Sequence, residues 1–168
     1  MITALEIDKT LSNSEIYNRL LPQIEGMINT DEPLITNLAN FIAILKEAFE
    51  KISWIGFYLR KEEKLFLGPF QGKVACTAIE LGNGVCGTAW EKKETIIVED
   101  VDKFPGHIAC DSNSRSEIVV PLLKDGDIYG VLDLDSSNLS SFNDDDKKYL
   151  EIFAGILTQK LEFSKMVL

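Results

Sequence analysis

The chain has 168 residues, of which 45% are hydrophobic and 26% are charged, and this composition excludes collagen-like and largely disordered proteins. Its length predicts a single domain, 1–168, with a hydrophobic core of its own. There are 17 Lys and Arg residues against 27 Asp and Glu residues, which gives a formal net charge of −10. An acidic chain without a basic block is a poor candidate for binding nucleic acid or an anionic membrane.

The cellular compartment is predicted from what the N-terminus and the cysteines suggest. The first residues contain no basic region followed by an apolar stretch, so no secretory signal is expected. No run of 18 apolar residues is present, and we expect a cytoplasmic protein with no membrane partner. The three cysteines, Cys76, Cys86 and Cys110, would then lie in a reducing compartment, where an odd number argues against a permanent disulfide framework.

An N-terminal helical segment of about 14–51 is predicted from apolar residues that recur at helical spacing. Pro22 is expected to interrupt the first helix, because proline lacks the amide donor that a helix interior needs. The apolar stripe of the second helix runs from Leu34 to Phe49, and Asn37 lies off this stripe. The second helix is therefore expected to pack one face against the rest of the domain.

Strands are predicted downstream, where the apolar period changes from helical to two. They cover 52–59, 65–70, 77–81, 95–98, 117–122 and 128–135. Asp125-Gly126 joins the last two as a hairpin, because this dipeptide accepts the positive φ of a tight turn. A short helix over about Thr88–Lys92 and a long loop over 99–114 are inserted between strands, and long ordered loops are often functional.

A final helix begins near Asn143, where Asp144, Asp145 and Asp146 lie at the positive end of its dipole. Helices, then strands with insertions, then a helix are typical of an α+β fold. We expect a central antiparallel sheet of about six strands. The terminal helices would pack on one face and pocket-forming loops on the other.

Three glycines, Gly82, Gly84 and Gly87, spell G-x-G-x-x-G, which is a pattern of dinucleotide-binding loops. That motif needs a long helix inside a parallel βαβ unit, whereas a one-turn helix is predicted here in an antiparallel setting. We therefore interpret the segment as a tight loop whose backbone N–H groups favour an anion. The adjoining helix N-terminus is expected to lower the pKa of the Cys86 thiol.

The cysteines could serve as metal ligands or as redox groups. Together with His107 they could supply a Cys₃His zinc site, but no C-x₂₋₄-C pair is present, so no metal site is predicted. A single cysteine is more often a small buried hydrophobic residue than a nucleophile. Here Cys110 lies in the polar loop, and Cys76 and Cys86 flank the glycine segment, which favours a redox role.

Two aspartates, Asp133 and Asp135, are two apart on a predicted strand and so leave the same face, and Glu117 begins the partner strand. Neighbouring buried carboxyls repel, and one of them keeps a proton that it can donate. The alternative is that both aspartates face solvent. Trp54 and Tyr58 also share a strand face, and they either wall a small pocket or pack in the core.

Four segments carry a family resemblance: GPFQGKVAC (68–76), GNGVCGTAW (82–90), HIACDSNSRSEIVVPL (107–122) and GVLDLDS (130–136). Together they closely resemble the free methionine-(R)-sulfoxide reductases, which are small enzymes of the GAF fold. The resemblance runs from about Trp54 to the end of the final helix and includes all three cysteine positions. It implies a GAF-like domain that reduces free L-methionine-(R)-sulfoxide and exists as a homodimer.

The resemblance implies a thiol mechanism without a cofactor. One cysteine thiolate attacks the sulfoxide sulfur and becomes a sulfenic acid, and a second thiol condenses with it to a disulfide that thioredoxin or a similar dithiol reduces. By the family pattern Cys110 is the nucleophile, Cys76 is the main resolving cysteine and Cys86 is the third. The family pattern also admits Cys86 in first place.

The resemblance further implies that Glu117, Asp133 and Asp135 bind the substrate and that Trp54 and Tyr58 form an aromatic wall. A carboxylate that bonds the ammonium of a free amino acid would explain rejection of peptide-bound methionine. We expect Asp135 or Glu117 to hold the catalytic proton and Asp133 to help bind the ammonium.

Two other functions compete with this reading. The chain is either an enzyme, or a GAF module that senses a small ligand without turning it over, or a redox switch whose disulfide alters association. The three cysteines have no role in a simple ligand sensor. Substrate-dependent turnover separates the enzyme from both alternatives.

Overall fold

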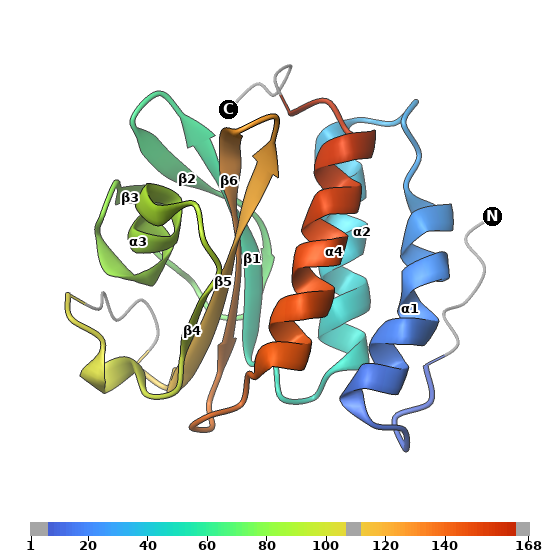
Figure 1. The fold of residues 1–168 in the computed structure, drawn as a ribbon, viewed down its shortest axis with the longest axis horizontal. Helices are drawn as coiled ribbons and strands as arrows, with labels where there is room; N and C mark the ends of the chain where they lie inside the picture. The colour runs from blue at the N-terminus through green and yellow to red at the C-terminus, as the bar shows by residue number, and fades with distance from the viewer. Residues whose placement is uncertain (1–6, 107–111, 164–168) are drawn as a thin grey trace.

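A computed structural model describes residues 7–106 and 112–163 of the chain (Figure 1). Its elements in chain order are α1 (Asn13–Met27), α2 (Leu34–Ala48), β1 (Trp54–Lys61), β2 (Lys64–Gln71), β3 (Ala78–Glu80), α3 (Gly84–Lys92), β4 (Ile96–Val98), a 3₁₀ turn (Val101–Lys103), β5 (Ser116–Lys124), β6 (Asp127–Ser136) and α4 (Asp144–Lys160). The strands form one antiparallel six-stranded sheet in the order β3-β2-β1-β6-β5-β4. This confirms the predicted α+β class and the central sheet.

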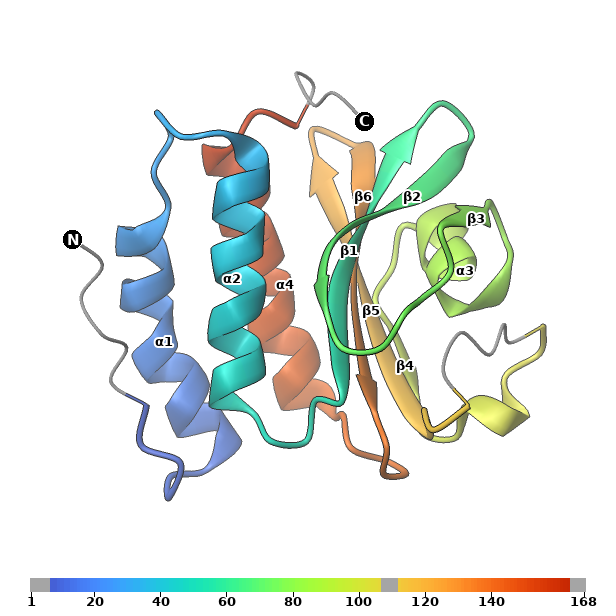
Figure 2. The ribbon, with the colours of Figure 1, turned by 180° about the vertical axis from the view of Figure 1, so that it is seen from behind.

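The sheet separates two hydrophobic layers. Helices α2 and α4 cover one face, with α1 packed on their outer side, and α3 with its flanking loops covers the other face (Figures 1 and 2). The alternation along β1 confirms the predicted period of two, because Ile55 and Phe57 pack in the core under the three helices. Trp54 and Tyr58 pack on the opposite face, in a smaller cluster with α3. The two faces of the sheet therefore carry separate hydrophobic clusters.

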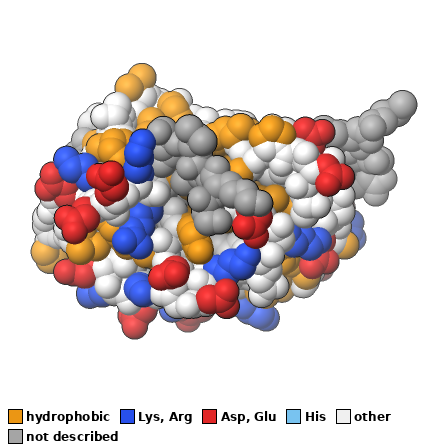
Figure 3. Space-filling model, turned by 90° about the horizontal axis from the view of Figure 1, so that it is seen from above, with side chains coloured by type: hydrophobic (Ala, Val, Ile, Leu, Met, Phe, Trp, Pro, Cys, Tyr) orange, Lys and Arg blue, Asp and Glu red, His pale blue; other side chains and the backbone are white. Residues whose placement is uncertain are grey.

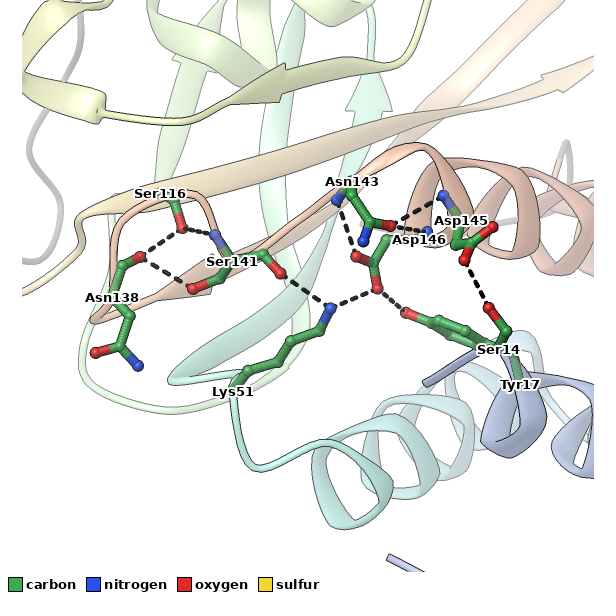
Figure 4. Close-up of polar contacts among 9 residues, drawn as sticks. All are labelled: Ser14, Tyr17, Lys51, Ser116, Asn138, Ser141, Asn143, Asp145 and Asp146. Carbon is green, nitrogen blue, oxygen red and sulfur yellow. Dashed lines mark hydrogen bonds and ion pairs between the residues drawn. The ribbon is translucent and has the colours of Figure 1, made fainter. Parts of the chain in front are cut away.

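A buried polar network joins the helical layer to the sheet (Figure 4). The carboxylate of Asp146, at the start of α4, accepts hydrogen bonds from the Tyr17 hydroxyl at 2.8 Å and from Lys51 Nζ at 2.6 Å. Its other oxygen accepts from the backbone N–H of Asn143 at 2.9 Å, which completes a capping box at the start of α4. One carboxylate thus fixes α1, α4 and the link between α2 and β1.

A second polar cluster holds the beginning of β5. Ser116 Oγ donates to the carbonyl of Asn138 at 2.7 Å and accepts from the backbone N–H of Ser141 at 3.2 Å (Figure 4). Ser116 is fully buried and directly precedes Glu117. The hydrogen bonds therefore fix the strand at the residue next to the candidate acid.

The expectation that Pro22 interrupts the first helix was wrong. α1 continues through Pro22, because Pro22 and Asn18 are both exposed and the carbonyl four residues before the proline can bond water instead. Asn37, which lies off the predicted apolar stripe of α2, is nevertheless buried. Its side chain accepts from the backbone N–H of Asn29 at 2.9 Å and donates to that residue's carbonyl at 3.0 Å. This pair of bonds joins α2 to the preceding turn.

The glycine segment also differs from its predicted loop. α3 begins at Gly84, four positions before the expected start, and the backbone N–H of Gly87 bonds the carbonyl of Asn83 at 2.9 Å to close the first turn. Gly84 has a φ of +61°, which suits glycine. A Cβ at Gly87 would lie 2.4 Å from the carbonyl oxygen of Glu80. The glycines therefore serve close packing of a short helix.

The surface carries charges of both signs. On the face shown in Figure 3, acidic and basic side chains are interspersed with apolar ones. Within the described residues, none of the helices is long and apolar enough to cross a lipid bilayer.

Candidate active site

A pocket opens on the face of the sheet opposite the three-helix layer. About 530 Å³ of space, which includes open solvent at its mouth, lies between its lining side chains. β1, β5 and β6 supply its floor, and the first turn of α3 and the loop after β2 supply its sides. Its lining residues are Trp54, Tyr58, Val74, Ala75, Ile79, Asn83, Gly84, Val85, Cys86, Ser114, Glu117, Asp133 and Asp135.

Strand register brings the predicted acids to this floor. Asp133 pairs with Gly56 across β1 and β6, and Asp135 pairs with Trp54. Across β5 and β6, Glu117 pairs with Asp135. Residues paired in this way project from the same face of a sheet, so the two aspartates face the pocket and not bulk solvent. All five predicted substrate-binding residues line this pocket.

Two of the acids are buried and are joined by a hydrogen bond between their side chains. Glu117 and Asp133 are each 6% exposed. Burial, followed by the neighbouring aspartate charges, raises the pKa of both carboxyls well above their usual range. The hydrogen bond between the two side chains contributes to the raised pKa of Glu117 and opposes the rise in the pKa of Asp133, which favours Glu117 as the donor and Asp133 as the acceptor. Asp133 Oδ1 is buried and has no hydrogen-bond partner.

The third acid has a separate partner. The hydroxyl of Ser114 donates a hydrogen bond to Asp135 Oδ1, and both residues line the pocket. The backbone carbonyl of Asp135 accepts from the backbone N–H of Ser53 at 2.8 Å. Asp135 is half-buried and is therefore more exposed than Asp133.

The aromatic wall is a stack of three rings. Trp54 lies between Tyr58, at a centroid distance of 6.0 Å, and Phe70, at 5.7 Å. The indole N–H donates to the carbonyl of Lys73 at 3.0 Å, and the Tyr58 hydroxyl donates to the carbonyl of Cys76 at 3.1 Å. Burial is the main reason that the pKa of the Tyr58 phenol is raised, so the phenol keeps its proton. These two bonds hold the loop after β2 over the pocket.

Two glycines, Gly56 and Gly72, leave room for the indole ring of Trp54. A Cβ at Gly56 would lie 2.4 Å from the ring of Trp54, and a Cβ at Gly72 would also lie 2.4 Å from it. Gly72 has a φ of +138°, which other residues rarely adopt. The orientation of the aromatic wall thus depends on these two positions.

The cysteines differ in environment. Cys86, in the first turn of α3, is a free thiol that is 4% exposed. Burial, followed by the charges of Asp133 and Glu117, raises the pKa of its thiol well above the usual range. The expectation that the helix N-terminus would lower this pKa was therefore wrong. Cys76 is half-buried and disulfide-bonded. Cys110 and His107 lie outside the described residues.

Several site residues were not singled out from the sequence. Phe70 and Ser114 belong to segments that carry the family resemblance, but nothing in their spacing marked them individually. Gly56 lies between Trp54 and Tyr58 at a spacing of two, and this shared strand face was the available signal. Among the described residues, Cys86, Glu117 and Asp133 have ligand atoms close enough together to hold a metal ion.

Comparison with known proteins places this geometry in a family. Residues 36–162 match the GAF domain family. The chain is 57% identical over 151 residues to GAF domain-containing protein A of Dictyostelium discoideum, which spans 89% of this chain and 94% of that protein. It is 44% identical over 161 residues to the free methionine-R-sulfoxide reductase of Saccharomyces cerevisiae, which spans 91% of this chain and 89% of the yeast protein.

Solved structures agree with these relatives. The chain superposes with a TM-score of 0.90 on the free methionine-R-sulfoxide reductase of Neisseria meningitidis in complex with its substrate. The two are 49% identical, and the superposition covers 96% of this chain and 97% of the other. The chain therefore belongs to the free methionine-R-sulfoxide reductase family of GAF-domain proteins.

Proposed function

We propose that this chain is an enzyme that reduces free L-methionine-(R)-sulfoxide to methionine. The observation that carries the proposal is Asp133, a buried carboxyl whose Oδ1 has no partner and which lines an open pocket. A buried acceptor without a partner costs about 1–3 kcal/mol, so such an atom favours a ligand that brings a donor. The ammonium of a free amino acid is such a donor, and a peptide-bound methionine lacks it.

The rest of the pocket supports the same substrate. The stacked rings of Trp54 and Tyr58 provide an apolar surface for the methyl-thioether end. The first turn of α3 lines the pocket, and its N-cap residue Asn83 makes no side-chain cap. Backbone N–H groups at such a helix start favour the substrate carboxylate. The two charged groups of a free amino acid would thus each have a partner.

Glu117 is proposed as the proton donor. Its pKa is raised by burial and by the neighbouring aspartates, and its proton lies in the hydrogen bond to Asp133. When the substrate ammonium neutralises Asp133, the proton on Glu117 becomes available to the sulfoxide oxygen. Asp135, held by Ser114, then serves in substrate binding.

The redox steps are proposed as follows. The Cys110 thiolate attacks the sulfoxide sulfur, and the sulfoxide oxygen takes up a proton. Transfer of the resulting hydroxyl group to the cysteine sulfur then leaves methionine and a cysteine sulfenic acid. The Cys76 thiol attacks that sulfenic acid, which expels water and forms a disulfide. Thioredoxin, or another dithiol, returns two electrons and two protons by disulfide exchange. The reaction needs no other cofactor.

Two observations support this order of cysteines. The raised pKa of the Cys86 thiol makes it a poor nucleophile at neutral pH, because the thiolate is the reactive form. Cys76 is disulfide-bonded, which is the state a resolving cysteine reaches after one turnover. A reducing cytoplasm that contains thioredoxin suits this catalytic cycle.

The family resemblance also supports a homodimer.

The test is thioredoxin-coupled turnover of free L-methionine-(R)-sulfoxide, compared with its N-acetylated analogue. We expect the free amino acid to be reduced and the analogue to be disfavoured by up to about 10⁴-fold in kcat/KM. Cys110→Ser is expected to abolish turnover even in a single cycle. Cys76→Ser is expected to release methionine once per chain and then stop, because the sulfenic acid is not resolved.

Other outcomes would change the proposal. If single-cycle reduction survives Cys110→Ser and is lost in Cys86→Ser, the enzyme stands and the order of cysteines is wrong. If the reduced wild-type protein turns over neither the free nor the acetylated sulfoxide, the ligand-sensing GAF reading replaces the enzyme.

A further inference from the structure

Three potential metal ligands meet inside the pocket. The sulfur of Cys86 and one carboxylate oxygen each of Glu117 and Asp133 all lie within 4.8 Å of one another. The three residues are buried and come from α3, β5 and β6. Since each lies on a different element, the ligand spacing that identifies zinc sites in a sequence does not reveal this cluster.

The chemistry of this set suits a borderline metal ion. Zinc binds cysteine sulfur at about 2.3 Å and carboxylate oxygen at about 2.0–2.2 Å, so a tetrahedral ion needs ligand separations of about 3.4–3.6 Å. Ligand atoms within 4.8 Å of one another reach that spacing by shifts on the order of 1 Å. A thiolate ligand favours Zn²⁺ over Mg²⁺ and Ca²⁺, which prefer oxygen ligands alone.

A second observation points to a cation. Asp133 is 6% exposed, and its buried Oδ1 has no hydrogen-bond partner. The described lining of the pocket contains three carboxyl groups and no Lys, Arg or His side chain. The acidic cluster therefore has no positive counterpart among these lining residues, and a divalent ion would supply one.

We propose that Cys86, Glu117 and Asp133 form a Zn²⁺ site that inhibits the enzyme, with the fourth metal position open to the pocket. Zn²⁺ bound there occupies the place of the substrate ammonium on Asp133 and engages the proton donor Glu117. Metal and substrate then exclude each other. The binding site stands on the cluster geometry, and the competition rests on the proposed function.

Cobalt is the probe for the site, because Co²⁺ bound by a thiolate absorbs in the near ultraviolet. We expect the full-length protein, with Cys76 in its disulfide, to show this absorption and Zn²⁺ to displace it. Cys86→Ser is expected to abolish the band, and Glu117→Gln and Asp133→Asn to weaken Co²⁺ binding by at least about tenfold. Asp135→Asn is the matched control, since it removes a carboxylate from the same face of β6 outside the cluster, and it is expected to keep the band.

The turnover assay, run with and without Zn²⁺, separates the possible failures. In the turnover assay Zn²⁺ is expected to raise the apparent KM for the sulfoxide without changing kcat. A band that persists in Cys86→Ser, or an active enzyme with no band, overturns the metal site and leaves the proposed function intact. A cobalt band in a protein that reduces no sulfoxide keeps the site and overturns the proposed function. An active, metal-binding enzyme whose KM does not respond to Zn²⁺ overturns the competition.

Discussion

Replacing Asp133 with asparagine is expected to stabilise the substrate-free protein at neutral pH while removing activity. Burial and the charge of Asp135 raise the pKa of the Asp133 carboxyl, which means that the fold is a poor environment for its anion. Asparagine has nearly the same size and keeps an oxygen that can accept the Glu117 hydrogen bond, but it carries no charge. A binding residue is thereby exchanged for stability, a trade that is common at active sites.

The magnitude follows from what the substitution removes. Asparagine still places a polar atom at the position of Asp133 Oδ1, so what the substitution removes is the buried charge. The desolvation of a buried polar group that lacks a partner costs about 1–3 kcal/mol, and an ionised carboxyl lies toward the upper end of this range. For a chain of this size each kcal/mol shifts Tm by about 2–4 °C, so the variant is expected to melt about 2–12 °C above wild type.

The pH dependence gives the sign of the effect independently. A carboxyl whose folded pKa lies above its unfolded value of about 3.9 contributes stability that is fully present below that value. This contribution is lost as the pH rises through the raised folded pKa of Asp133. The gain in Asp133→Asn is therefore expected to be smallest near pH 4 and to grow toward pH 8.

The assay is thermal and urea unfolding of both proteins at several pH values, with Asp127→Asn as the control. Asp127 is an exposed aspartate on the same strand, and its substitution is expected to leave Tm nearly unchanged. A variant that is less stable than wild type at pH 7.5 would refute the reasoning. So would a gain of equal size at pH 4 and pH 8, because it could not come from the charge.

Three further substitutions test individual parts of the structure. Ser114→Ala removes the hydroxyl that holds Asp135 and is expected to lower kcat/KM by about 5–30-fold, measured by coupled turnover, with little change in Tm. Gly56→Ala places a Cβ 2.4 Å from the pocket indole and is expected to cost about 1–3 kcal/mol in urea unfolding and to shift the tryptophan fluorescence. Lys51→Met leaves the buried Asp146 carboxylate without its ion pair and is expected to cost about 3–5 kcal/mol in the same unfolding assay.

Much of the site floor could be predicted because strands have a period of two. The spacing of Asp133 and Asp135 placed both on one face, and the Asp125-Gly126 turn made β5 and β6 partners, which brought Glu117 opposite Asp135. These inferences needed only local geometry. Whether that face was a pocket or solvent depended on α3 and the loop after β2, and local geometry says nothing of how these pack.

The environment of Cys86 could not be predicted for the same reason. A helix end contributes roughly 0.3–1 kcal/mol at an exposed site, whereas burial can shift a pKa by about 3–5 units. The sequence showed the helix end but not the two buried carboxyls beside the thiol, so the sign of the expected shift was wrong. The early start of α3 was missed because glycine counts against a helix locally, while close packing on Glu80 requires it.

The function was harder to predict from the residues alone than the fold was. Composition, spacing and strand faces alone predicted a small pocket with acids, aromatic rings and cysteines. The choice of a sulfoxide as substrate came from four segments that resemble a known family, and comparison with relatives then showed membership of that family. The preference for one sulfoxide epimer depends on the shape of the pocket, which the spacing of residues in the sequence does not predict.

The proposed activity is tested most directly by giving the reduced protein, with thioredoxin and its reductant, a diastereomeric mixture of free L-methionine-(R)- and L-methionine-(S)-sulfoxide and following both epimers by chromatography. We expect the R epimer to be converted to methionine and consumption to stop when only the S epimer remains. Consumption of both epimers would contradict the proposed specificity. No methionine from either epimer would contradict the proposed enzyme itself.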